Sequence, residues 1–176
     1  MKRRQLLEVL LVLAVAVNSL FLGAELAQAT AMVAVHAAIL ACLFFLAWKY
    51  RLYLRGLLFC LGYFLCLGFL LGEMLRIYYL VPNIAAKVNA LLTYYYYIFV
   101  LTILYLPLYK LLAEPRELRG KIIDAGQEYY VVELCPTIFS GLKPGVYAVK
   151  RNGTNKYIGD EVVIIKDFRG RLKVKA

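Results

Sequence analysis

The sequence lacks the motifs by which most enzymes are recognised. It contains no Gly-x-Ser-x-Gly, no phosphate-binding loop, and no Ser/Lys or Cys/His arrangement with a supporting spacing. The segment Cys135-Pro136-Thr137, followed by Ser140, has no nearby base that could activate a nucleophile. We therefore expect a protein that is not an enzyme.

Histidine and cysteine are also scarce. His36 is the one histidine, which excludes a haem with two imidazole ligands from a single chain. The four cysteines, Cys42, Cys60, Cys66 and Cys135, show neither disulfide nor zinc spacing. We predict no metal and no other cofactor, and we interpret the cysteines as small buried hydrophobic residues.

Charged residues are rare in the first part of the chain. Residues 1–109 hold eight Lys/Arg and three Asp/Glu, whereas residues 110–176 hold thirteen and eight. Hydrophobic residues make up 63% of the sequence and the mean hydropathy is +0.70, far above an ordinary globular domain. This division predicts a membrane part followed by a soluble part.

Four apolar runs are long enough to cross a bilayer, whose core of about 30 Å needs roughly 20 helical residues. They cover residues 6–22, 29–48, 57–80 and 88–112. Breaks fall at residues 23–25, at 49–56 and at 81–83, where Pro82 disfavours a helical residue before it. The sequence predicts a four-helix transmembrane domain over residues 1–113, a linker over 114–119 and a β-domain over 120–176.

Lysine and arginine predict the orientation. They gather at the N-terminus, between the second and third runs, and after the fourth, whereas the other two connections hold only Arg76 and Lys87. By the positive-inside rule, both termini face the cytoplasm of a plasma or inner membrane. The basic start, the first run and Ala27-Gln28-Ala29 also resemble a cleavable signal peptide, but we interpret this segment as a first span.

Every predicted span has a polar side chain at a similar depth, toward the outer surface. These residues are Asn18, His36, Glu73 with Arg76, and Asn89 with Thr93. An ionisable residue inside a span is a candidate functional site, and Glu73 and His36 could share a proton or bind a small ligand or cation. The same side chains could instead form interhelical hydrogen bonds and anchor the rim, which is the interpretation we favour.

Small residues four positions apart mark helix faces that pack closely. Gly68 and Gly72 lie on the third span, and Ala34 and Ala38 lie on the second. They predict helix packing within the chain or, alternatively, between copies of it.

Four consecutive tyrosines occupy a full turn of the fourth span, so at least two of their hydroxyls face lipid or a partner. They are Tyr94, Tyr95, Tyr96 and Tyr97. Because a tyrosine hydroxyl away from water needs a hydrogen-bond partner, this turn is a candidate contact with another subunit, a lipid or a quinone-like ring.

After residue 120, short runs rich in Val, Ile and Tyr alternate with turn residues. This pattern indicates a small all-β domain of five strands, an OB-like or SH3-like barrel. Its basic face is expected to dock on anionic lipid or a partner, or simply to be solvated, with nucleic acid the least favoured ligand. The residues of this face are Lys150, Arg151, Lys156, Arg169, Arg171, Lys173 and Lys175.

One stretch of the β-domain resembles a known family. Gly159-Asp160-Glu161-Val162-Val163-Ile164, followed by Gly170 and Leu172-Lys173-Val174, is similar to the closing half of the OB-type domain of short NfeD-family membrane proteins. Those proteins also place helical spans before a small β-barrel. The resemblance implies a non-enzymatic membrane partner protein, often associated with scaffold-forming proteins.

We therefore expect an integral membrane interaction or accessory protein. It would assemble through its helices, as a homo-oligomer or as a subunit of a larger membrane complex. Its β-domain would dock on a partner, on its own copies or on anionic lipid. The alternative is a small homo-oligomeric channel or ligand-gated membrane effector, in which the outer polar residues line a pore.

Overall fold

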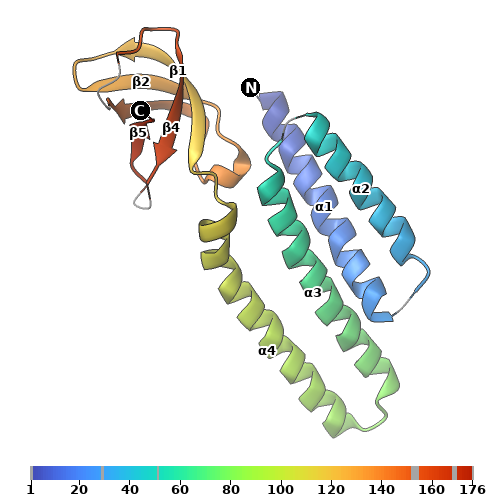
Figure 1. Cartoon of the computed structure of the whole chain (residues 1–176). Coiled ribbons are helices and arrows are strands. Elements are labelled where there is room, and N and C mark those ends of the chain that lie inside the picture. The colour runs from blue at the N-terminus through green and yellow to red at the C-terminus, as the bar shows by residue number, and fades with distance from the viewer. Residues whose placement is uncertain (1, 29, 51, 152–154, 168–169, 176) are drawn as a thin grey trace. The chain divides into compact units, whose positions relative to one another are not determined.

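The computed structural model describes residues 2–28, 30–50, 52–151, 155–167 and 170–175 and divides into two units. Leu6–Ala113 forms a helical unit, and Glu114–Ala176 makes up most of the other, a β-barrel (Figure 1). The expected order, apolar helices followed by a small barrel, is confirmed.

The helical unit contains four α-helices and a terminal π-helical turn. They are α1 (Lys2–Gln28), α2 (Val33–Lys49), α3 (Leu54–Leu80), α4 (Ile84–Leu108) and η1 (Tyr109–Ala113). Three segments, Gln5–Gln28, Leu54–Leu80 and Ile84–Ala113, are long and apolar enough to cross a membrane. The fourth apolar helix, α2, has 17 residues.

The first predicted helix break, at residues 23–25, is wrong because Gly23 packs tightly inside a helix. α1 continues through residues 23–25, where an added Cβ on Gly23 would overlap the carbonyl oxygen of Leu65 and lie 2.6 Å from the backbone nitrogen of Phe69. The second predicted break, at residues 49–56, is present but shorter, since α2 ends at Lys49 and α3 begins at Leu54, two residues before the buried Gly56. Close helix contact thus offsets the low helix propensity of glycine.

The connection between α3 and α4 follows local chemistry. α3 ends at Leu80, before Val81 and Pro82. The Asn83 side chain accepts hydrogen bonds from the backbone nitrogens of Ala85 (2.9 Å) and Ala86 (3.2 Å), so α4 begins earlier than the predicted residue 88.

The barrel has five strands in the closed order β1-β2-β3-β5-β4. They are β1 (Glu117–Ala125), β2 (Tyr129–Leu134), β3 (Gly145–Lys150), β4 (Glu161–Lys166) and β5 (Leu172–Val174). β3 and β5 are parallel, and the other neighbours are antiparallel. β1 starts inside the predicted linker because Glu117–Lys121 pair with β4.

Alternating strand residues fill the barrel. Leu118, Ile122, Tyr130, Val132, Leu134, Val149, Val162, Ile164 and Val174 form a single buried cluster. Where the chain enters the barrel, the Lys166 ammonium pairs with Glu114 and donates a hydrogen bond to the Ser140 carbonyl oxygen (2.8 Å). The barrel therefore has its own core and its own fixed entry.

Candidate functional site

Asn18 and His36 join α1 to α2. The His36 Nδ1 and the Asn18 Oδ1 lie 3.3 Å apart, and the Asn18 amide also donates to the Ala14 carbonyl oxygen at 2.9 Å. Because an amide oxygen only accepts, Nδ1 of His36 is the protonated nitrogen in this pair. The Phe21 ring stacks on the imidazole, with centroids 5.7 Å apart.

Glu73 and Arg76 form an ion pair along α3, with Oε2 and Nη2 3.3 Å apart. The Glu73 side chain is 13% exposed and the Arg76 side chain 53%. The carboxylate of Glu73 is therefore largely buried, whereas the guanidinium of Arg76 is exposed, as in a snorkelling arginine.

On α4, the Thr93 hydroxyl donates to the Asn89 carbonyl oxygen of the same helix at 2.9 Å, and both residues are exposed. The six predicted polar residues, all within the described part of the chain, thus fall into three groups with no hydrogen bond or ion pair from one group to another. The structure does not gather them into one shell.

The glycine pair of α3 packs on α1. A Cβ on Gly68 would overlap the Leu20 carbonyl oxygen, and one on Gly72 would lie 2.8 Å from Cα of Ala24 and from Cβ of Ala27. Together with Gly23 on α1, these residues form a glycine seam (Gly23, Gly68 and Gly72) inside the chain. Ala34 and Ala38, by contrast, lie exposed on α2.

The tyrosine turn of α4 points mostly outward. Tyr95, Tyr96 and Tyr97 are each more than half exposed, and Tyr94 is half-buried with its ring edge-to-face on Tyr97 at 6.2 Å. Their hydroxyls have no hydrogen-bond partner among the described residues. The turn therefore presents phenol groups on the outside of the helix.

An aromatic cluster between α3 and α4 was missed by the sequence reasoning. Tyr63 lies 4.2 Å from Tyr105 between ring centroids, Phe59 lies 4.9 Å from Tyr105, and Tyr109 joins through Phe59 at 5.8 Å. The Tyr63 hydroxyl is 3.1 Å from the Thr102 hydroxyl. Aromatic residues four apart on each helix were the available signal. This cluster is the main aromatic contact between the two helices.

Glu8 was also missed, although an acid inside an apolar run is a signal in itself. It is 3% exposed and lies on the buried stripe of α1, in register with Leu11 and Val15. Further along that stripe, the Ser19 hydroxyl donates to the Val15 carbonyl oxygen at 2.6 Å. The inward face of α1 therefore contains two polar side chains.

On the barrel, most of the predicted basic face is exposed. Lys150 on β3 lies directly opposite Lys173 on β5, and neither forms an ion pair within the described residues. Lys175 pairs with Glu117 at 2.6 Å. Lys156 and Arg171 are exposed, Arg151 is half-buried, and Arg169 lies outside the described residues.

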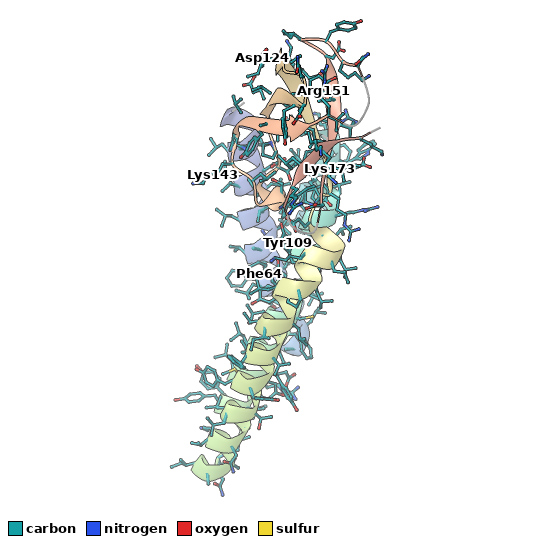
Figure 2. The ribbon with its side chains drawn as sticks, turned by 90° about the vertical axis from the view of Figure 1, so that its left-hand side faces the viewer. Phe64, Tyr109, Asp124, Lys143, Arg151 and Lys173 are labelled. Carbon is teal, nitrogen blue, oxygen red and sulfur yellow. The ribbon has the colours of Figure 1, made fainter. Side chains whose placement is uncertain are left out.

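Arg151 is held in place rather than extended into solvent. Its Nη1 donates to the carbonyl oxygens of Gly126 (2.8 Å) and Gln127 (3.2 Å), and its guanidinium carbon lies 4.4 Å from the centre of the Tyr130 ring. Figure 2 shows Arg151 and Asp124 at one end of the barrel and Lys143 toward the other. The guanidinium of Arg151 is therefore held at this end of the barrel, which also has the exposed acids Asp124 and Glu128.

Comparison of the chain with protein-family models, with curated proteins and with solved structures gives no match. The resemblance of residues 159–174 to short NfeD-family proteins stays a prediction. Within the described residues, no three His, Cys, Asp or Glu side chains come together as a metal-binding group.

Proposed function

We propose that this chain is a non-enzymatic membrane adaptor. Its helices embed it in a bilayer and assemble with further helices, either copies of the chain or another membrane protein. Its β-barrel, which has the strand order of an OB-type domain, serves as a docking module on the cytoplasmic side.

Embedding is supported by the outward faces of the helices. Large apolar side chains are exposed along all four helices, including Leu10 on α1, Phe45 on α2, Phe69 on α3 and Phe99 on α4. Such a surface is unfavourable in water and favourable in hydrocarbon.

Assembly is supported by one observation above all, the exposed tyrosines in the middle of α4. Tyr95 to Tyr97 lie 11 to 13 residues after Ile84, which is about 16–20 Å along the helix and close to the centre of a core of about 30 Å. A phenol hydroxyl without a partner is costly at that depth, because lipid tails offer no acceptor. No residue of α4 is buried within the chain, so a neighbouring helix has room to supply the partner groups.

The intact mass in native-lipid particles tests assembly. We expect the wild-type chain to be a defined complex, and the triple variant Tyr95→Phe, Tyr96→Phe, Tyr97→Phe to dissociate, since it loses only the three hydroxyls. Tyr79→Phe is the matched control because Tyr79 is 78% exposed but lies at the end of α3. A wild-type chain that is monomeric and without partners would contradict the proposal.

Whether both termini lie on the cytoplasmic side, as we propose, depends on whether α2 crosses the membrane. Its 17 residues extend about 25 Å, the lower limit for a span, and Lys49 at its end can snorkel to the headgroups. Four crossings put the N-terminus and the barrel on the same side, whereas three would separate them. Labelling of single cysteines near each terminus with a membrane-impermeant reagent distinguishes the two arrangements.

A further inference from the structure

Helix α4 has polar side chains along one stripe that faces away from α3. The half-buried residues Tyr94, Ile98 and Tyr105 recur at helical spacing and mark the side that packs on α3, where Tyr105 contacts Phe59 and Tyr63. Five residues on the far side recur in the same way, and four of them are exposed. This set, the α4 stripe, consists of Asn89, Thr93, Tyr96, Val100 and Ile103.

The spacing of the α4 stripe suits a contact with another helix. Its residues are separated by steps of four and three in alternation, the spacing of the positions that meet when two helices wrap around each other. Residues 88–109 contain no Asp, Glu, Lys or Arg. A second helix can therefore approach along the whole stripe without burying a charge.

The polar groups of the α4 stripe are not fully paired within the chain. The Thr93 hydroxyl donates to the Asn89 carbonyl oxygen, but the Asn89 side-chain amide and the Tyr96 hydroxyl have no hydrogen-bond partner among the described residues. Tyr96 lies 12 residues after Ile84, about 18 Å along the helix, at a depth where lipid tails offer neither donor nor acceptor. Pairing these groups across a helix contact would remove the cost of leaving them in hydrocarbon.

The chemistry of the α4 stripe matches a second copy of itself. The amide of asparagine and the hydroxyls of threonine and tyrosine each both donate and accept hydrogen bonds. Copies of one membrane protein insert with the same orientation, so two α4 helices related by a two-fold axis along the membrane normal are parallel. Each residue then lies opposite its own copy at the same depth. Asn89 meets Asn89 and Tyr96 meets Tyr96, and both pairs can hydrogen-bond, whereas a stripe with only donors or with a charge would need a different partner.

We infer that the chain forms a parallel two-fold dimer through the α4 stripe, with Asn89 and Tyr96 hydrogen-bonded across the axis. The inference rests on the proposed membrane embedding and assembly, and it names the partner as a second copy and the contact as one face of α4. Tyr95 lies about one third of a turn away from Tyr96 and belongs to a neighbouring face.

Oxidative cross-linking of single cysteines in the full chain tests the dimer, in membranes with a low ratio of protein to lipid. The probes on the α4 stripe are Val100→Cys and Ile103→Cys. The matched controls are Phe99→Cys and Leu104→Cys, which are next to the probes in the sequence but lie on either flank of the stripe. Ile103 and Leu104 are equally exposed, at 53% each, and none of the four changes removes a polar group.

The native cysteines are replaced by alanine so that each chain has one thiol. They are Cys42, Cys60, Cys66 and Cys135. We expect a disulfide-linked dimer at positions 100 and 103, because a two-fold stripe brings each of these residues within disulfide reach of its own copy, and little at 99 and 104. Adding Asn89→Leu and Tyr96→Phe to the Val100→Cys chain should reduce the yield of dimer, whereas adding Tyr95→Phe should leave it unchanged.

The intact mass of the Asn89→Leu, Tyr96→Phe variant with its native cysteines, in native-lipid particles, is an independent measurement, and we expect a monomer where the wild-type chain is a dimer. An unchanged dimer mass would overturn the inference. Equal cross-linking at all four positions, or cross-linking at 99 or 104 alone, would also overturn it, because the copies would then meet by chance or by another face. No cross-link at any position would overturn it too. If the wild-type particle then contains another protein, the proposed assembly still stands, whereas a monomeric wild-type chain would overturn both.

Discussion

The helical unit and the barrel differ in where their large apolar side chains lie. In the barrel they point inward, and Ile122, Tyr130, Val132 and Leu134 are almost completely buried. In the helical unit many large apolar side chains are exposed, and α4 buries none. The difference teaches that burial organises the barrel and close backbone contact organises the helices, and it fits the proposed membrane embedding of the helices.

The two units also differ in what fills their contacts. Large branched and aromatic residues fill the barrel, whereas α1 and α3 meet through the glycine seam, where backbones touch. Without a hydrophobic driving force between helices, small residues gain van der Waals contact. We therefore expect the barrel to be destabilised mainly when side-chain volume is removed. The contact between α1 and α3 should be destabilised mainly when volume is added.

Removing volume should harm the barrel most. Leu134→Ala empties a site with no exposure, and we expect a loss of about 2–5 kcal/mol in the barrel's stability. Hydrogen exchange of the full chain in detergent, followed on strands β1 to β5, measures the loss. Val146→Ala is the control, because Val146 is exposed on the same barrel. Equal effects of the two changes would contradict a core confined to the barrel interior.

Adding volume should harm the helices next. Gly68→Ala places a methyl group on the Leu20 backbone of α1, and we expect a cost of about 1–3 kcal/mol. Gly62→Ala is the matched control on the same helix, where an added Cβ meets nothing within 4 Å, so it should be neutral or stabilise by up to about 1 kcal/mol. Thermal melting in mild detergent separates the two outcomes. If Gly68→Ala melts no lower than Gly62→Ala, the glycine seam does not hold α1 to α3.

The five strands of the barrel could be predicted from the sequence because the patterns that indicate them are local. Alternating residues such as those of β2, separated by glycine and proline, predict five strands without knowledge of their partners. The extra length of α1 could not be predicted, since the close contact of Gly23 with α3, which offsets the low helix propensity of glycine, is not visible in the local sequence. Helix contacts are non-local, and local propensity cannot report them.

The candidate site shows the same limit. The depth of each polar residue along its helix could be counted from the sequence, but depth does not specify which face of the helix a side chain occupies. The polar residues predicted to form one layer therefore lie in separate groups in the structure, such as Asn18 with His36 and Glu73 with Arg76. The aromatic cluster around Tyr105 needed the pairing of α3 with α4. The channel alternative, which requires one wet axis, stays a prediction.

A polar contact inside the barrel should have a smaller effect that depends on pH. Tyr130→Phe removes the acceptor of the Lys156 N–H, and we expect a loss of about 0.5–1.5 kcal/mol near neutral pH. Because the folded pKa of Tyr130 lies below its ordinary value of 10.0, ionisation favours the folded barrel. The difference between wild type and variant should therefore grow as pH rises through the lowered pKa toward 10.0.

Urea melting followed by hydrogen exchange in the barrel, at several pH values, measures this difference. Tyr129→Phe is the control, since Tyr129 is an exposed neighbour on β2 and its hydroxyl has no hydrogen-bond partner among the described residues. A difference that shrinks with rising pH would show that the positive groups do not act on Tyr130.

The smallest effect is expected for the ion pair between Glu73 and Arg76 in the helical unit. Glu73→Gln keeps the shape and leaves Arg76, which is half-exposed, able to reach polar surroundings. Pairs of this spacing contribute about 0.2–0.5 kcal/mol, so the melting temperature should scarcely change, and the intact mass in native lipid should stay the same. The Arg76→Gln variant should show the same small effect on the melting temperature as Glu73→Gln, because each change removes the same ion pair. A large effect of Glu73→Gln alone would instead show that the acid acts independently of Arg76, as a buried site or as part of an assembly contact.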